Sequence, residues 1–364
     1  MTDFDAWSEK DVTQILLTRG VVPLLGAGVN KSGRPAGFEW KYDPLRGDQP
    51  PQYPPDGREL ASYLASYFSA PPDLAQTEDL IRISQFIDSV KTSGRELYET
   101  LSAIFEAAQS PGPVHQFFAR TAKLLRERKR LQVILTTNYD DLLERALEAD
   151  GEQYDLITYI ASGRREYRGR FMHWAPGEPP KIIEGGNSYS LSPEKRTVIV
   201  KLHGAIQRGS SGEQGADGAA EFEAEAQRKD NFVITEDHYI EYLTHTDISS
   251  QLPYEVTNAL RNSSYLFLGY AMKDWNLRAI LRRLWGDQEQ RDMPSWAIQK
   301  EVDPFEKAFW EKRSVTIIPY DAEKYIELLH SELDALTAPP PEPAPAPEAV
   351  QAGPVVAAED GVPG

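Results

Sequence analysis

The sequence predicts an α/β protein with one doubly wound, Rossmann-like parallel sheet of about six strands, and three observations carry this prediction. Short apolar runs rich in β-branched and aromatic residues recur along the chain, as expected for strands that are covered on both faces. Amphipathic helical patterns lie between these runs. Glycine and polar residues directly follow several of the runs, at the strand ends where doubly wound sheets bind ligands.

The candidate strands are short and apolar enough to be buried in a parallel sheet. They are Val21–Leu25, Val133–Thr137, Val198–Leu202, Tyr265–Gly269, Trp296–Gln299 and Val315–Pro319. Pro23 argues against the first of them, because proline has no N–H to donate to a neighbouring strand. Candidate helices that accompany the strands are Asp140–Glu148, Asp274–Trp285, Pro304–Lys312 and Ala322–Leu336.

A long helical insertion, residues 56–128, separates the first two strands. It begins with a capping-box pattern from Asp56 to Glu59, and apolar residues then repeat at helical spacing: Leu60, Tyr63, Leu64, Tyr67 and Phe68. We expect a helical subdomain over one edge of the sheet. Its apolar faces exceed what one sheet edge obviously covers, which makes it a candidate contact surface for another subunit. The alternative is that these faces close a ligand crevice within one subunit.

One domain is expected over residues 1–336. Within it, residues 208–227 are acidic and glycine-rich, and predict a flexible loop. Residues 337–364 are rich in alanine and proline and contain no aromatic residue, so they predict a disordered tail or linker that buries no core.

Composition excludes several classes of protein. Of the 364 residues, 40% are hydrophobic and 26% charged, which is typical of a globular protein. The net charge of −17 argues against nucleic acid or an anionic membrane surface as a partner. The absence of cysteine excludes disulfides, cysteine-ligated zinc, iron–sulfur clusters and thiol nucleophiles. Because no signal peptide and no apolar run of ~20 residues is visible, we expect a cytoplasmic protein.

A glycine-rich turn follows the first strand. Its candidate ligand-binding residues are Gly26, Ala27, Gly28 and Asn30. Glycines at a strand end let backbone N–H groups approach a diphosphate without a Cβ in the way, although an ordinary tight turn is the alternative. Lys31 and Arg34 lie close enough to add positive charge for a phosphate, or are simply solvated loop cations.

Polar residues follow the second strand, where Thr137, Asn138 and Asp140 stand at its carboxyl end. Asp140 opens a predicted helix, so a helix cap explains it without any ligand. Asn138 is not required for that cap and is free to orient a ribose hydroxyl or a water molecule.

The third and fourth strands end in His203-Gly204 and in Gly269-Tyr270. A neutral imidazole at the end of a buried strand is a candidate general base near neutral pH, and a structural histidine is the alternative. Gly269 allows close backbone approach. Asp274 follows and either contributes to the site or caps the next helix.

In this order, the strand ends resemble one family. The segments concerned are Gly26–Asn30, Thr136–Asp140, Lys201–Gly204, Val233–Tyr239 and Phe267–Asn276. Together they resemble the SIR2-like domain of bacterial NAD hydrolases, many of which act in anti-phage defence. The resemblance extends over about Val21 to Asn276.

The resemblance implies a role for each strand end. The turn of Gly26, Ala27 and Gly28 would cradle the NAD diphosphate, and Asn138 and Asp140 would flank the nicotinamide ribose as catalytic residues. His203 would be the catalytic histidine, and Gly269 would lie near the adenosine half. The further cofactor-binding candidates are Asn30, Arg34, Thr137 and Asp274.

The chain departs from protein-deacetylating sirtuins in four respects. It has no four-cysteine zinc module, Thr137 stands where those enzymes have glutamine, and Asn30 stands where serine is usual. An inserted segment around Gly163–Leu191 also lengthens the interval between Asn138 and His203. Loss of the zinc module disfavours peptide deacylation, because that module helps to shape the acyl-lysine cleft.

These features predict an NAD⁺ hydrolase that needs no metal and releases nicotinamide and ADP-ribose, although an internal hydroxyl competing with water would give a cyclic product. An NAD-dependent deacylase and a non-catalytic NAD or ADP-ribose sensor are the alternatives. Because constant NAD hydrolysis would be toxic, we expect control through a homo-oligomer. The resemblance also implies an ATPase or another defence-system protein as a partner.

Overall fold

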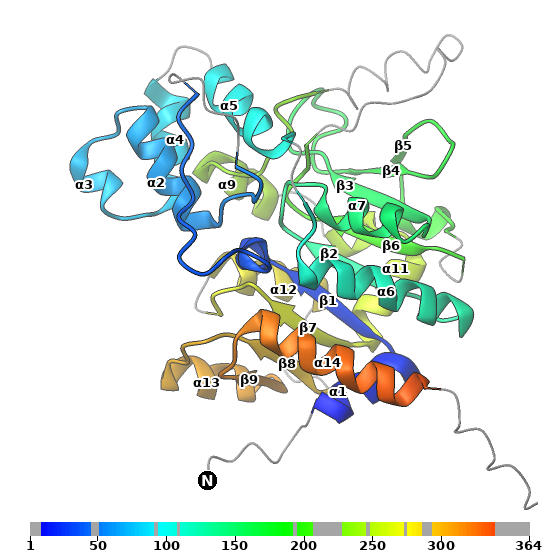
Figure 1. Ribbon diagram of the computed structural model, residues 1–364. Helices are drawn as coiled ribbons and strands as arrows, with labels where there is room; N and C mark the ends of the chain where they lie inside the picture. Colours follow the sequence, from blue (N-terminus) through cyan, green and yellow to red (C-terminus); the bar gives the residue numbers. More distant parts are fainter. Residues whose placement is uncertain are drawn as a thin grey trace, which may run out of the picture.

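A nine-stranded sheet, in the order β5-β4-β3-β6-β2-β1-β7-β8-β9, forms the centre of the described part of the chain (Figure 1). The strands are β1 Val21–Leu25, β2 Val133–Thr136, β3 Tyr154–Tyr159, β4 Phe171–Trp174, β5 Lys181–Ile183, β6 Thr197–Lys201, β7 Ser264–Leu268, β8 Ser295–Ile298 and β9 Val315–Ile318. Only β4 pairs antiparallel, with β3 and with β5; the remaining neighbours are parallel. The predicted doubly wound α/β sheet is confirmed.

This computed structural model describes residues 9–44, 51–90, 94–107, 110–191, 195–206, 228–244, 248–272, 275–285 and 293–338. The expected loop at 208–227 and the candidate residue Asp274 lie outside these ranges, as do tail residues 339–364. Thr337 belongs to the last helix, so the predicted start of the tail was one residue too early. In the described ranges, no helix is long and apolar enough to cross a membrane.

The prediction of about six strands was too low, because it missed β3, β4 and β5. All six candidate strands exist within one residue of their predicted bounds. The missed strands contain polar residues that satisfy one another in the interior. Asp155 on β3 is fully buried, where it contacts His173 on β4 at 2.8 Å and accepts a hydrogen bond from Arg196 at 3.0 Å. In the sequence these polar residues suggest a solvent-exposed segment, because the residues that pair with them in the interior are distant along the chain.

Pro23 sits inside β1 without breaking it. It pairs in register with Leu266 of β7, whereas the pairing of β1 with β2 begins only at Leu24. The missing N–H of proline therefore falls where the ladder to β2 has not begun.

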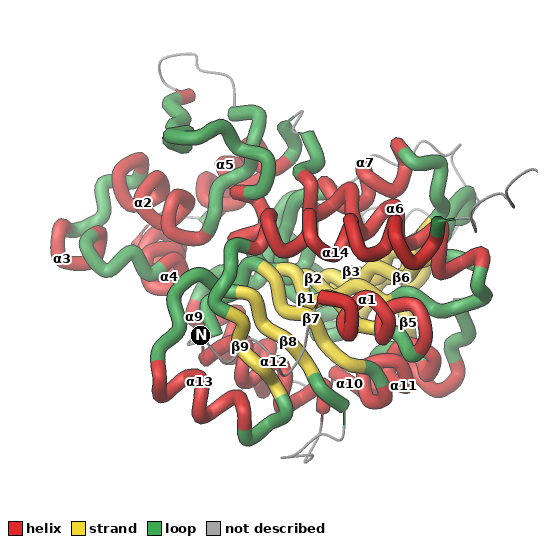
Figure 2. Tube along the Cα trace, turned by 60° about the horizontal axis from the view of Figure 1, so that its bottom comes forward, coloured by secondary structure: helices red, strands yellow, loops and turns green. Residues whose placement is uncertain are grey.

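Helices cover both faces of the sheet (Figure 2). One layer contains α1 Glu9–Thr18, α6 Pro113–Glu127, α7 Leu142–Ala149 and α14 Ala322–Thr337. The other contains α10 Ile248–Gln251, α11 Tyr254–Asn262, α12 Trp275–Trp285 and α13 Pro304–Glu311. The alternation of β1 serves both layers, because Val21 and Leu25 pack into the first core while Val22 and Leu24 pack into the second.

The helical insertion divides into two parts. Helix α6 packs on the sheet, whereas α2 Gly57–Tyr67, α3 Pro72–Ala75, α4 Leu80–Val90 and α5 Arg95–Phe105 form a separate cluster, at the upper left of Figure 1. The predicted capping box of Asp56 and Glu59 is present at the start of α2. The cluster shares its core with Tyr139, Ile206 and Phe232, which follow β2 and β6 or pair beside them. The insertion therefore lies over the carboxyl ends of central strands and not, as predicted, beside an edge strand of the sheet.

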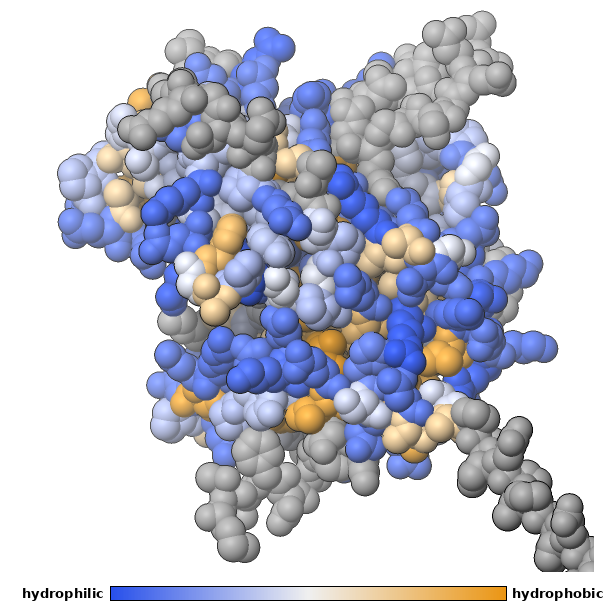
Figure 3. Space-filling view, in the orientation of Figure 1, coloured by the Kyte–Doolittle hydropathy of each residue, from blue (hydrophilic) through white to orange (hydrophobic). Residues whose placement is uncertain are grey.

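The expectation that the apolar faces of the insertion exceed what covers them is wrong. Leu60, Leu64 and Ile87 are almost completely buried against the rest of this cluster. Of the large hydrophobic side chains described within residues 56–128, only Tyr67 and Val90 are exposed. The side of the insertion visible in Figure 3 is mostly hydrophilic. The faces are buried within the chain, and whether they also close a ligand crevice stays a prediction.

Candidate functional site

The sheet brings the predicted strand ends together at one edge. β6, β2, β1 and β7 are consecutive neighbours and run parallel, so the residues that follow them emerge side by side. From β1 the chain continues to β2 on one side, and later returns to β7 on the other side. Doubly wound sheets bind ligands at such a switch point, outside the carboxyl ends of the strands.

The glycine turn after β1 packs directly against the end of β7. Gly26 N–H donates to Leu268 O at 2.9 Å, and Gly28 N–H donates to Gly269 O at 3.0 Å. A Cβ on Gly28 would lie 2.8 Å from the Gly269 Cα, closer than real side chains approach backbone. The close packing of this turn against the end of β7 is thus enough to explain why glycine occupies both positions. Their binding of a diphosphate stays a prediction, because both of these N–H groups already have carbonyl partners.

Asn30, Asn138 and Asp140 form a buried polar chain beside the turn. Asn138 Nδ2 donates to Asn30 Oδ1 at 3.4 Å, and Asn30 Nδ2 donates to Asp140 Oδ2 at 3.3 Å. Asn138 Oδ1 is buried and has no hydrogen-bond partner among the described residues. A buried acceptor without a donor costs free energy, so this oxygen is suited to receive a donor from a ligand.

Asp140 precedes the N-cap of α7, which is Asp141, so it is not itself the cap that the sequence offered as an alternative. Its Oδ1 accepts a hydrogen bond from Leu142 N–H at 3.2 Å, at the start of α7, two residues later than the predicted start of this helix. Burial raises the pKa of the Asp140 carboxyl, opposed by the positive charge of Lys201 and by the hydrogen bonds from Leu142 and Asn30. Asp140 therefore contacts the start of α7 with one carboxylate oxygen and Asn30 with the other, and its role beside a ribose stays a prediction.

Lys201, at the end of β6, is a site-supporting residue that the sequence analysis did not select. Its side chain is 1% exposed, and its Nζ donates to the backbone carbonyl of Asp140 and pairs with Glu144 Oε1 of α7 at 2.7 Å. The lysine thus ties the loop after β2 to α7. A lysine in an otherwise apolar buried strand was the available signal, because lysine is almost never fully buried without a partner.

His203 follows β6 and is 5% exposed. Its Nδ1 lies 3.3 Å from the hydroxyl of Tyr239, and the Nε2 is buried without a partner in the described part of the chain. Burial lowers the pKa of His203 from 6.5 to about 3, so the ring is neutral at pH 7. One nitrogen of this ring therefore carries a lone pair that can accept a proton.

The two cations expected near a phosphate are engaged in ion pairs. Arg34 donates to both carboxylate oxygens of Glu59 at 2.7 and 2.9 Å, and its side chain is 6% exposed. Lys31 pairs with Asp56, although its own side chain is half exposed. Both partners are in the first turn region of α2, so these cations anchor the insertion to the turn. Phosphate binding by Arg34 stays a prediction.

Thr137 lies on the same edge, where its Oγ1 is 2.7 Å from the hydroxyl of Tyr270, which follows Gly269. This contact joins the ends of β2 and β7 across β1. Among the residues with described positions, no group of three or more histidine, aspartate or glutamate side chains is placed to hold a metal ion.

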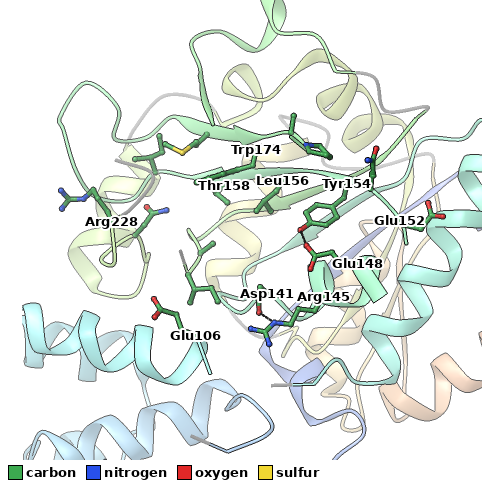
Figure 4. A pocket seen from close by; sticks show the side chains of 18 of the residues that line it. Glu106, Asp141, Arg145, Glu148, Glu152, Tyr154, Leu156, Thr158, Trp174 and Arg228 are labelled. Carbon is green, nitrogen blue, oxygen red and sulfur yellow. Dashed lines mark hydrogen bonds and ion pairs between the residues drawn. The ribbon is translucent and has the colours of Figure 1, made fainter. Parts of the chain in front are cut away.

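A separate cavity of about 700 Å³ lies against β3 and β4 (Figure 4). Leu156 and Trp174 belong to its strand wall, and the Asp141–Arg145 ion pair belongs to its helical wall. Its other carboxylates are also partnered: Glu148 by Tyr154, Glu152 by Arg126 and Glu106 by Lys229. None of the predicted site residues that the structure describes lines this cavity, so it is distinct from the described part of the candidate site.

The fold and the strand ends define an α/β protein with a buried polar site at the carboxyl edge of its parallel sheet. Residues 132–318 match the family described as SIR2-like domain, and the chain belongs to that family. The predicted resemblance is thereby confirmed.

Two similar proteins are informative about the extent of this likeness. The NAD(+) hydrolase ThsA of Acinetobacter baumannii (strain 532279) is 22% identical over 231 residues, which are 64% of this chain and 36% of that protein. The chain thus spans about a third of the length of this relative. A mutant Sir2 homologue in complex with ADP ribose aligns with 92% of this chain and 99% of its own, at 14% identity and a TM-score of 0.36.

Proposed function

We propose that this protein is an NAD⁺ hydrolase that cleaves the bond between nicotinamide and ribose. The observation that carries the proposal is a pair of buried polar atoms at neighbouring strand ends, His203 Nε2 and Asn138 Oδ1, which have no hydrogen-bond partner among the described residues. Membership of the SIR2-like family and the similarity to an NAD(+) hydrolase support the same reaction. A ligand with hydroxyl groups, such as a ribose, would satisfy both atoms.

The proposed reaction needs one general base and one positioned water molecule. The bond between the anomeric carbon and the nicotinamide nitrogen breaks, the bond electrons leave with neutral nicotinamide, and an oxocarbenium-like centre remains. The water oxygen then bonds to that carbon, and its proton passes to His203 Nε2. Asn138 Oδ1 accepts a hydrogen bond from the water or from a ribose hydroxyl and thereby orients it. The products are nicotinamide, ADP-ribose and a proton.

Incubation of the purified protein with NAD, with and without an acetylated peptide, tests this function. Release of nicotinamide and ADP-ribose in both samples supports the hydrolase. Turnover only with peptide would instead identify a deacylase. Binding of NAD or ADP-ribose by calorimetry without turnover would identify a sensor. The last two results contradict the proposal.

Asn138→Ala is expected to lower NAD turnover by roughly 10- to 100-fold while NAD binding is retained, because it removes a positioning group and not the base. Steady-state rates and calorimetric titration with NAD measure both quantities. Asn262→Ala is the matched control, since the exposed Asn262 side chain of α11 donates its hydrogen bonds, within the described residues, to Asn258. An unfolded Asn138→Ala protein, or one with normal turnover, would contradict the positioning role.

We further propose that hydrolysis is controlled by assembly, as suits a cytoplasmic enzyme that depletes NAD during anti-phage defence. A homo-oligomer, or a complex with an ATPase or another defence protein, would keep the activity low until it forms. Activity per subunit is then expected to rise with protein concentration across the range in which light scattering detects association. A monomer with full, concentration-independent activity contradicts control by self-association.

A further inference from the structure

The segment Val233–Tyr239 is close to His203, although the proposed mechanism assigns it no role. Val233 N–H donates to His203 O at 2.9 Å, and Ala205 N–H donates to Asn231 O at 3.1 Å. Between them, Gly204 has a φ of +81°, and a Cβ there would lie 1.9 Å from Asn231 O. Glycine is therefore required for this close approach. The backbone of His203 is thus held on one side by the segment that leads into α9 (Glu236–Thr244).

Thr235 contacts the first turn of α9 and thereby fixes the orientation of this helix relative to the preceding segment. Its side chain is almost completely buried, and its Oγ1 accepts a hydrogen bond from His238 N–H at 3.2 Å. Its carbonyl accepts from Tyr239 N–H at 3.1 Å. These contacts have the pattern of a helix N-cap, so Tyr239 is placed one turn into α9. The same segment therefore contacts the backbone of His203 through Val233 and the imidazole ring of His203 through Tyr239.

The Tyr239 hydroxyl meets His203 at the nitrogen opposite the unpartnered one. The hydroxyl oxygen lies 3.3 Å from Nδ1, and the two rings are edge to face with centroids 5.2 Å apart. We propose that Tyr239 is a positioning residue: its oxygen accepts the Nδ1–H of His203 and so leaves the lone pair on Nε2. This inference rests on the proposed hydrolase function, in which Nε2 is the base.

Tautomer selection matters because a neutral imidazole has one proton and two nitrogens. If Nε2 held the proton, His203 would face the substrate with a donor and would have no base there. The same phenol oxygen also stabilises the imidazolium that forms when Nε2 takes a proton, because Nδ1–H then carries part of the positive charge.

Few charged groups surround this ring. Tyr239 and Tyr242 face it from α9, and burial alone lowers its pKa. Lys201, two residues before it, is paired with Glu144, and Arg283 of α12 donates to the backbone carbonyl of Tyr242. The hydroxyl of Tyr239 is therefore the polar side-chain group with a recorded hydrogen bond to the ring in the described structure.

Tyr239→Phe is expected to lower kcat for NAD by roughly 10- to 100-fold with little change in KM, because orientation of the base is lost and substrate contacts are kept. The acid limb of the kcat profile should also move to lower pH, since removal of the oxygen disfavours the imidazolium. Tyr242→Phe is the matched control. Tyr242 is on the same helix with its ring against His203, but its buried hydroxyl has no partner among the described residues.

A readout independent of catalysis completes the test. In protein labelled with ¹⁵N-histidine, the imidazole nitrogens report which of them carries the proton, and His203→Ala identifies the signals of His203. We expect Nδ1 to be protonated in the wild type and in Tyr242→Phe, and this preference to be lost in Tyr239→Phe. A wild type without turnover even at concentrations at which light scattering shows it associated rejects the hydrolase function. An Nε2-protonated His203 in an active wild type, or equal kinetics of the two tyrosine variants, rejects the role of Tyr239.

Discussion

Replacing His203 with alanine is expected to reduce NAD cleavage by about 10²–10⁴-fold, the usual contribution of one positioned acid–base group. The variant should still fold, because among the described residues the ring makes one long hydrogen bond, to Tyr239, and its Nε2 makes none. It should also still bind NAD, since the groups expected to hold the diphosphate are on another strand end. Rates of nicotinamide release and thermal melting measure the two effects.

His330→Ala is the control for this substitution, because His330 lies on α14 and contacts Arg120 away from the strand ends. It should retain wild-type turnover. Normal turnover in His203→Ala would reduce His203 to a structural histidine, and loss of both folding and turnover would mean that its ring is needed for packing.

Acidification gives a second test of His203. Burial lowers its pKa from 6.5 to about 3, so neutral, base-competent imidazole should persist down to about pH 4. A rate that falls with a midpoint near pH 6.5 because of His203 would contradict this burial.

The lowered pKa of His203 also makes the stability of the fold depend on pH. Below about pH 6.5 the His203 imidazole is protonated in the unfolded chain but stays neutral in the folded chain. The free energy of unfolding therefore decreases as the pH falls from 6.5 towards 3. His203→Ala should lose less stability over that range.

Lys201→Met is expected to destabilise the fold by about 3–5 kcal/mol, the range for removal of one partner from a buried ion pair. Glu144 would remain 1% exposed without its ammonium partner, and the carbonyl of Asp140 would lose a donor. Because Asp140 directly follows the loop that holds Asn138, turnover should fall as well. Urea denaturation measures the loss in the free energy of unfolding.

Two comparisons make the Lys201 result interpretable. Lys181→Met removes a cation from an exposed pair with Glu178 and should change stability by less than about 1 kcal/mol. The double variant Lys201→Met, Glu144→Leu should recover much of the lost stability, because it leaves no buried carboxylate unpaired. A single variant as stable as the wild type would show that water reaches Glu144 in solution.

Features that depend on local pattern could be predicted from the sequence. Short apolar runs located six strands to within one residue, and the capping box located the N-cap of α2 at Asp56. Strand ends could be read in the same way, because parallel strands place their carboxyl ends on one edge wherever they lie in the sheet. Asn138 and His203 could therefore be selected as candidate site residues before any contact was known.

Which buried polar residues pair with one another could be seen only in the tertiary structure. β3 and β4 were missed because Asp155 and His173, polar in sequence, neutralise their cost of burial by contacting each other and Arg196. The pairing of Arg34 with Glu59 and the approach of Tyr239 to His203 likewise join residues 25 and 36 positions apart. Local periodicity reports which side of an element is buried, whereas the identity of a hydrogen-bond partner depends on how distant elements pack.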